Sequence, residues 1–294
     1  MAKKEKRRFG DRKDAKLVRE LDGMHLIIPM ICPNRTDNEA FVTERIDLTN
    51  AAAYLDKLNA ENTDGYPYKI FQLIVATMIR TVTQRPHMNR FICNKTLYQR
   101  NEITAAFTMK KRFADDGGEA LAKIHGKPDT TLFSIHEQMR KQITACKSGK
   151  NDSVSDVMDT FLKLPRWLTR IIAAFFRWLD RHGWVPTSIS SGDPYYASVY
   201  LSNLGSIKLH AGYHHLTNWG TTSVFIIVGE RKLRPFYNAD GTMEMRDSID
   251  IGMTVDERIS DGYYFAKTIR MMKYLLEHPE LLEQPASEPV DFEG

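Results

Sequence analysis

The apolar residues of this chain follow two patterns in turn, one typical of helices and one typical of strands. Residues 69–83 carry apolar side chains at steps of three and four residues, the spacing of one helix face: Ile70, Phe71, Ile74, Val75, Met78, Ile79 and Val82. Residues 223–228 (SVFIIV) instead form a short β-branched and aromatic run, which is typical of a strand. A chain in which both periods occur within one unit must bury helix faces against a sheet.

Other segments continue the alternation. Further strands are predicted at residues 41–47, 104–113, 197–201 and 249–255, and further helices at 49–59, 131–147 and 262–277. The sequence Asn-Ala-Asp-Gly at 238–241 is a turn signal ahead of the last strand. The order of these elements predicts an α/β fold, a two-layer sandwich of a mixed β-sheet and helices.

The chain has 294 residues and no glycine- or serine-rich linker. We therefore expect one domain over residues 21–283. Residues 1–20 are dominated by charge and are expected to form a basic, solvated N-terminal arm. Residues 284–294, with two prolines and three acids, are expected to form a loose C-terminal tail.

Composition and charge limit where in the cell the protein is expected and what it is expected to bind. The net charge of +4 is too small an excess to indicate a nucleic acid partner. Cys32, Cys93 and Cys146 lie far apart in sequence, which favours reduced thiols and a cytoplasmic protein. No apolar run reaches the roughly 18 residues that a spanning helix needs, so no membrane partner is expected.

Residues 161–186 concentrate aromatic and basic side chains. They include Trp167, Trp178, Trp184, Arg166, Arg170, Arg177 and Arg181. We favour an amphipathic helix that packs on the body of the protein with its arginines in water. Two alternatives stay open: a helix that lies on a membrane surface, and a wall or lid over a pocket for an apolar substrate.

Three ordered segments carry a resemblance: 202–207 (SNLGSI), 220–235 (GTTSVFIIVGERKLRP) and 256–282, which contains DERISDG. In this order and spacing they resemble the catalytic domain of the 2-oxo acid dehydrogenase acyltransferases and, more distantly, chloramphenicol acetyltransferase. The resemblance implies a chloramphenicol acetyltransferase-like fold for residues 21–283. Only the basic arm precedes these residues, so we expect a stand-alone layout without a lipoyl domain.

The resemblance also implies an assembly and a chemistry. Members of this family form trimers with active sites between subunits, and a thiol carrier, coenzyme A or dihydrolipoamide, brings the acyl group. In the family motif HxxxDG the histidine is the general base, and a serine or threonine elsewhere donates a hydrogen bond to the oxyanion. Here Asp261 and Gly262 match the motif and Ser202 matches the donor, but Glu257 takes the place of the histidine.

A glutamate base in that position is costly. A proton moves from a thiol of pKa about 8.5 to an unperturbed glutamate of about 4.3 at an extra penalty near 3 kcal/mol relative to histidine. Burial could raise the pKa of a carboxyl group by several units and recover much of this. Glu257 therefore remains a candidate base if its site is dry.

His214 and His215 offer a second candidate base. Neighbouring residues of an extended segment point to opposite sides, so we expect at most one of the two rings to face the site. The alternative is a buried or interfacial histidine pair with no catalytic role. A metal site that adds His210 is disfavoured because no carboxylate or cysteine lies at a ligand spacing, so no metal is expected.

Two of these site residues also have a purely structural interpretation. The Ser202 hydroxyl could satisfy backbone groups at a strand end. Asp261 is expected to be structural, for example paired with Arg35 or Arg258, between which the sequence does not choose.

The sequence as a whole predicts a homotrimeric, coenzyme A-dependent acyltransferase that acts on a small, apolar acceptor. Ser202 would stabilise the oxyanion, and Glu257, His214 or His215 would serve as the base. The alternative is a catalytically impaired relative that keeps the fold and acts as a binding or scaffold module.

Overall fold

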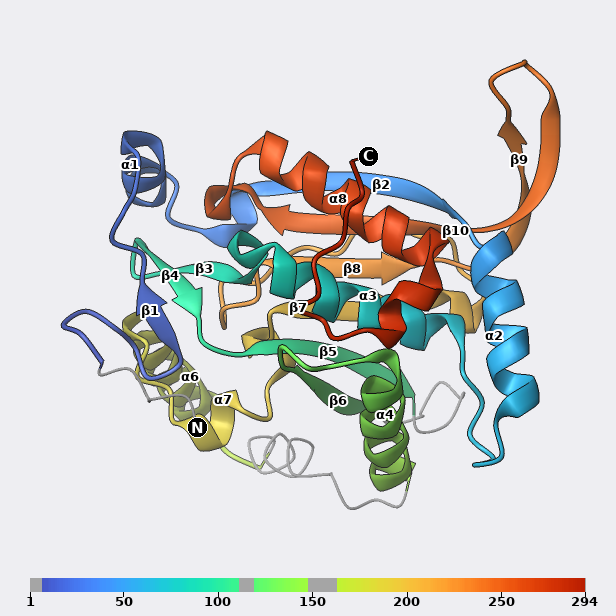
Figure 1. Ribbon diagram of the computed structural model, residues 1–294. Coiled ribbons are helices and arrows are strands. Elements are labelled where there is room, and N and C mark those ends of the chain that lie inside the picture. The colour runs from blue at the N-terminus through green and yellow to red at the C-terminus, as the bar shows by residue number, and fades with distance from the viewer. Residues whose placement is uncertain (1–6, 111–118, 148–162, 294) are drawn as a thin grey trace.

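A mixed β-sheet of seven strands runs through the computed structural model, which describes residues 7–110, 119–147 and 163–293 (Figure 1). The strand order is β2-β10-β8-β7-β5-β6, and β9 pairs with the far part of β10. Strand β7 runs parallel to β5 and β8, and the other pairs are antiparallel. The strands are β2 (Glu39–Asp47), β5 (Ile103–Lys110), β6 (Glu119–Gly126), β7 (Val199–Asn203), β8 (Val224–Val228), β9 (Lys232–Tyr237) and β10 (Met243–Asp256).

Helices cover one face of this sheet, and α3 and α8 lie across it in Figure 1. These helices are α2 (Thr49–Glu61), α3 (Ile70–Gln84), α4 (Leu132–Lys147) and α8 (Gly262–Glu277). Helix α3 is buried almost all round because it lies between the sheet and α8. The prediction of a two-layer α/β sandwich is confirmed, and the predicted bounds of these four helices differ from the observed ones by no more than two residues. The helix expected within residues 161–186 is shorter and spans Arg166–His182.

A second, smaller sheet lies beside the main one. Its order is β1-β4-β3, with β1 (Ala15–Leu17), β3 (Arg90–Cys93) and β4 (Thr96–Arg100). Helices α1 (Gly23–Ile31), α6 (Arg166–His182) and α7 (Thr187–Ser190) complete the fold. Gly183 ends α6 in the left-handed conformation (φ 71°) that glycine adopts at little cost.

The two ends of the chain pack more closely than expected. In the described part of the arm, residues 15–17 form a strand paired with β4, and Ala15 is fully buried. Near the other end, the Ala286 N–H donates to the Thr130 carbonyl, and the Ala286 side chain is buried. The expectations of a solvated arm and a loose tail fail here because backbone hydrogen bonds hold both segments to the body.

Some expected segments differ in length or extend beyond the described residues. Strand β10 begins at Met243 rather than near residue 249, because its first half pairs with β9 in a hairpin that projects from the body (Figure 1). Strand β5 is described to Lys110, so residues 111–113 of the predicted strand lie outside the description. The same holds for residues 161 and 162 before α6 and residues 1–6 of the arm.

The second face of the sheet is covered by an extended segment, residues 209–219, rather than by a helix. Two glycines make room for it. A Cβ on Gly252 would lie 2.0 Å from the Gly212 carbonyl oxygen, and one on Gly229 would lie 2.4 Å from the Ala211 nitrogen. The segment therefore crosses β8 and β10 in direct backbone contact with the sheet.

Candidate functional site

Ser202 lies on the second face of the sheet. Successive residues of a strand point to opposite faces, and in β8 Val224, Ile226 and Val228 pack in the helix-covered core. Phe225 belongs to the cluster on the other face. Ser202 is in register with Ile227, which shares that face with Phe225. Among the described residues, the half-buried Ser202 hydroxyl has no hydrogen-bond partner. No hydrogen bond therefore supports a purely structural role for this serine.

Glu257 stands at the opposite end of the sheet. It begins a 3₁₀ turn directly after β10, its side chain is exposed, and its N–H donates to the Asn38 carbonyl at 3.0 Å. Ile227, the neighbour of Ser202, pairs with Gly252 of β10, five residues before Glu257. Five residues of strand span roughly 16 Å. Within one chain, therefore, the structure does not bring Ser202 and Glu257 together.

His214 and His215 lie on the second face, in the segment that crosses it. Their rings stack on each other with centroids 4.4 Å apart, and the His214 ring also stacks on Phe225 at 4.3 Å. The expectation that the two rings point to opposite sides is wrong, because the segment is not a regular strand. Phe225 is in register with Tyr200, two residues before Ser202 on the same face. Of the candidate bases in one chain, His214 thus lies beside the strand that carries Ser202.

The His214 ring is held in one orientation. Its Nδ1 atom lies 2.7 Å from the His215 backbone carbonyl oxygen. A carbonyl oxygen only accepts hydrogen bonds, so Nδ1 must carry the proton and donate it. In the neutral ring, Nε2 is then the atom with a free lone pair, and the described residues offer it no hydrogen-bond partner.

Asp261 has a structural place, although not the expected one. It is the exposed N-cap residue of α8, and its carboxylate accepts a hydrogen bond from the Tyr264 N–H at 2.8 Å. The two arginines proposed as its partners, Arg35 and Arg258, pair instead with Asp256. The expected pairing of Asp261 with one of these arginines is therefore wrong, because both guanidinium groups lie against Asp256.

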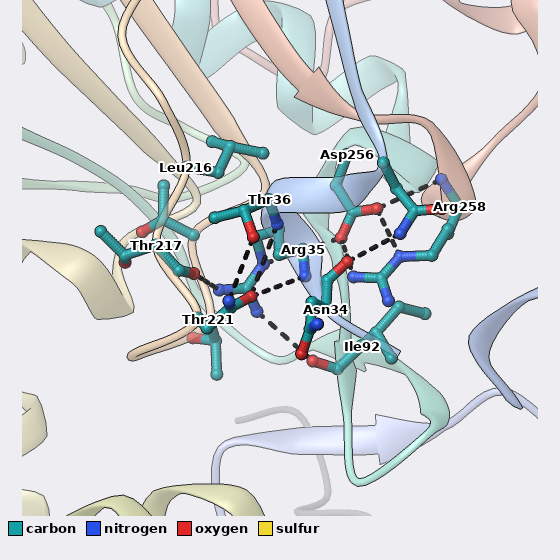
Figure 2. Close-up of polar contacts among 12 residues, drawn as sticks. Asn34, Arg35, Thr36, Ile92, Leu216, Thr217, Thr221, Asp256 and Arg258 are labelled. Carbon is teal, nitrogen blue, oxygen red and sulfur yellow. Dashed lines mark hydrogen bonds and ion pairs between the residues drawn. The ribbon is translucent and has the colours of Figure 1, made fainter. Parts of the chain in front are cut away.

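Asp256, Arg258 and Arg35 form a buried ion cluster at the end of β10 (Figure 2). The Asp256 carboxylate accepts two bonds from the Arg258 guanidinium, both at 2.7 Å, and lies 3.6 Å from Arg35 Nε. The Arg35 guanidinium also donates to the carbonyls of Thr217, Ile92 and Gly220. Burial lowers the pKa of Arg35, and the Asp256 charge opposes that shift. The cluster ties the segment around Thr217 to the main sheet.

A second buried acid, Asp180, lies at the end of α6. It accepts hydrogen bonds from the Tyr196 hydroxyl at 2.6 Å and from the Gly220 N–H at 3.1 Å. Burial raises the pKa of Asp180, while those hydrogen bonds and the charge of Arg35 act in the opposite direction. Asp180 thus fixes the C-terminal end of α6 against the end of the segment that carries the histidines.

These contacts enclose a pocket of about 870 Å³, called here the α6 pocket. It is lined by residues 33–36, 92–95 and 215–220, by Arg258, and by the α6 residues Ala174, Arg177, Trp178, Asp180 and Arg181. Of the sequence-predicted site residues, only His215 lines it. Helix α6 therefore forms a pocket wall, in agreement with the wall-or-lid alternative. Trp167 and Phe175 of the same helix do not line the pocket and are exposed.

Sequence reasoning missed Asp256, Asp180 and Lys95 as residues of this region. Asp256 stands directly before Glu257, but nothing local to it indicates that Arg35, which is distant in sequence, also lies against it. The spacing of Arg177 and Arg181 could have revealed the pocket wall, because residues four apart share a helix face.

The described residues contain no cluster of histidine, cysteine, aspartate or glutamate that could hold a metal ion; His210 pairs instead with Glu230. No helix in this part of the chain is long and apolar enough to span a membrane.

No protein-family model and no curated protein matches the sequence. Solved structures do match. The chain is similar to a probable dihydrolipoamide acetyltransferase from Listeria monocytogenes, with a TM-score of 0.59 and 13% identity over 94% of this chain and 97% of the other. It is similar to the cubic core of the pyruvate dehydrogenase multienzyme complex (TM-score 0.60, 13% identity, 91% and 94% covered). It is also similar to chloramphenicol acetyltransferase, with a TM-score of 0.54 and 12% identity over 89% of this chain and 99% of the other.

At these identities the likeness is one of fold. The chain has the fold shared by dihydrolipoamide acetyltransferase catalytic cores and chloramphenicol acetyltransferase, as the resemblance predicted. Two of the three similar structures are acetyltransferases by name.

Proposed function

We propose that this protein is an acyltransferase in which His214 is the general base and Ser202 stabilises the oxyanion. The observation that supports it best is the hydrogen bond from His214 Nδ1 to the His215 carbonyl, which leaves Nε2 as the basic nitrogen. Both residues belong to the same face of the sheet: His214 stacks on Phe225 of β8, and β8 pairs with β7, the strand that carries Ser202. Two acetyltransferase structures with the same fold agree with the reaction class.

The two side chains divide the chemistry of acyl transfer. His214 Nε2 removes the proton from the acceptor hydroxyl or amine as it attacks the acyl carbonyl. The Ser202 hydroxyl donates a hydrogen bond to the oxygen that becomes negative in the tetrahedral state. The proton on His214 then passes to the departing thiolate. Bonds and charge balance with no redox step and no metal.

The acyl donor we propose is a thioester of coenzyme A or of another thiol carrier. A thioester carbonyl needs a hydrogen-bond donor on its oxygen and a base near the attacking group, and Ser202 with His214 supply both. The residues that bind the remainder of the carrier are not assigned. The acceptor enters through the α6 pocket, whose wall includes His215.

Glu257 enters the proposal through a second copy of the chain. Its side chain is exposed and far from Ser202 of its own chain, so it can act at the site only from a neighbouring protomer. A homotrimer with sites between protomers is the arrangement that the resemblance implies. The similarity to a cubic core, itself an assembly, supports an oligomer. Glu257 would there stabilise the positive charge that His214 acquires.

The test is thioester turnover, measured as thiol release from acetyl-coenzyme A in the presence of a panel of small hydroxyl and amine acceptors. We expect His214→Ala to lower kcat/KM by about 100-fold or more, since general bases contribute at least that much. His210→Ala is the matched control, because His210 lies in the same segment but is exposed and pairs with Glu230. Equal activity of the two variants would remove His214 from the mechanism.

A non-catalytic binding protein is the second candidate. The exposed glutamate in place of the motif histidine favours it. It predicts that the wild type lacks turnover with every thioester offered, yet still binds ligands in the α6 pocket. If Glu257→His then gains thioester turnover, the fold has kept a competent cavity and has lost only its base.

A further inference from the structure

One face of α6 points its cations at the pocket. Ala174, Arg177, Trp178 and Arg181 all line it, and their spacing places them on one side of the helix. Arg166 and Arg170 belong to the same helix but do not line the pocket. The charge on the pocket wall therefore comes from the last two turns of α6.

Lys95 lines the same pocket from a part of the fold other than α6. It occupies the two-residue turn between β3 and β4, where Cys93 pairs with Thr96. Asn94 and Lys95 both have positive φ, 47° and 59°, as a tight hairpin turn requires. The fold accepts this unfavourable conformation at a lysine, and the turn places the exposed Lys95 among the residues that line the pocket.

The pocket has two groups of cations, the exposed Arg177, Arg181 and Lys95, called here its mouth, and the buried Arg35 and Arg258. Arg35 and Arg258 are buried and neutralised in part by Asp256, as described above. Arg177, Arg181 and Lys95 are exposed, and no carboxylate of the described residues forms an ion pair with any of them. Asp180, an acid among the lining residues, is already engaged by Tyr196 and Gly220. The mouth thus carries positive charge without a counter-charge.

The pocket also offers apolar and aromatic surface between these charges. Ile92, Leu216, Trp178 and Trp219 line it. The Trp219 indole N–H donates to Asp193 at 2.6 Å, so its ring is fixed in place. A ligand with a flat or aliphatic body can contact this surface while its charged group meets the mouth.

We infer that the α6 pocket selects an organic anion: a carboxylate or phosphate carried on an apolar or aromatic body. This inference differs from the small, apolar acceptor expected from the sequence, because it adds a negative group. The inference rests on the proposed function only where it names this anion as the acyl acceptor. Arg177, Arg181 and Lys95 bind the negative group, and the acceptor hydroxyl or amine at the other end then lies toward the histidine segment.

The first experiment is calorimetric binding to the full chain without any acyl donor. The probes are phenylbutyrate, its uncharged amide phenylbutyramide, and phenylpropyl phosphate. We expect both anions to bind about tenfold more tightly than the amide, with the difference reduced by salt because exposed charges are screened. The tighter of the two anions identifies the preferred charged group. Equal affinity of anion and amide overturns the inference.

A matched pair of double variants locates the effect. Arg177→Gln with Arg181→Gln should remove most of the preference for the anion. Arg166→Gln with Arg170→Gln makes the same charge change on the same helix outside the pocket, and should leave the preference in place. If the two double variants behave alike, the binding is not in the α6 pocket, and the inference fails.

Two outcomes separate this inference from the proposed function. Competitive displacement of phenylbutyrate by desulfo-coenzyme A would show that the pocket binds the carrier, which overturns the acceptor assignment and leaves acyl transfer standing. Selective anion binding in a protein without thioester turnover would support the anion site and count against the proposed function.

Discussion

Asp256 compensates two buried guanidinium groups, and its replacement is the most direct test of the cluster. Asp256→Asn leaves Arg258 and Arg35 without a counter-charge in a buried place, for which the expected loss of unfolding free energy is about 3–5 kcal/mol. Asp261→Asn is the control, because asparagine caps a helix as well as aspartate does. Urea unfolding of both variants measures the difference, and comparable stability of the two would show that the buried cluster contributes nothing.

At the same scale, the sequence predicts residue types better than residue partners. The motif predicts Arg35 or Arg258 as the partner of Asp261, but in the structure both arginines pair with Asp256. A helix cap is a local feature that sequence can indicate. An ion pair between residues 35 and 256 depends on the packing of the entire sheet, and no local pattern records it.

At the scale of elements, the missing side chain of Gly252 lets the segment of residues 209–219 cross β10 in close contact. In Gly252→Ala the new Cβ would lie 2.0 Å from the Gly212 carbonyl oxygen, and backbone must move. Overpacking of this kind costs about 1–3 kcal/mol. We expect a lower midpoint of thermal unfolding and, because His214 lies in the displaced segment, a loss of thioester turnover.

Gly262→Ala provides the comparison, since a Cβ there meets nothing within 4 Å and the residue is in a helix. It should be neutral or slightly stabilising. If Gly252→Ala is as stable and as active as Gly262→Ala, the close contact between the segment and the sheet has no part in the site.

Long periodic elements were predictable, and short or irregular ones were not. Helices α3 and α8 follow from the spacing of their apolar residues. Strand β1 has three residues and is defined by its pairing with β4, which no periodicity reveals. The stacked rings of His214 and His215 likewise depend on an irregular path over Phe225.

At the scale of the whole molecule, the separation of Ser202 and Glu257 makes a prediction about assembly. If sites form between protomers, Ser202→Ala and Glu257→Gln chains that are mixed, unfolded and refolded together should regain part of the wild-type turnover. Some interfaces in the mixture then combine an intact Ser202 with an intact Glu257. Each variant refolded alone is the control. If sedimentation shows mixed oligomers with no regained activity, the two residues do not share a site.

The end of the chain has a consequence for how this protein can be shortened or joined to others. Arg80, in the middle of α3, is buried, and its guanidinium donates to the carbonyls of Leu281 and Glu288 and to the Gln284 side chain. These acceptors all belong to the last fourteen residues. A chain cut before Gln284, or one whose end is pulled away by a fused partner, takes two of these three acceptors from a buried cation in its central helix.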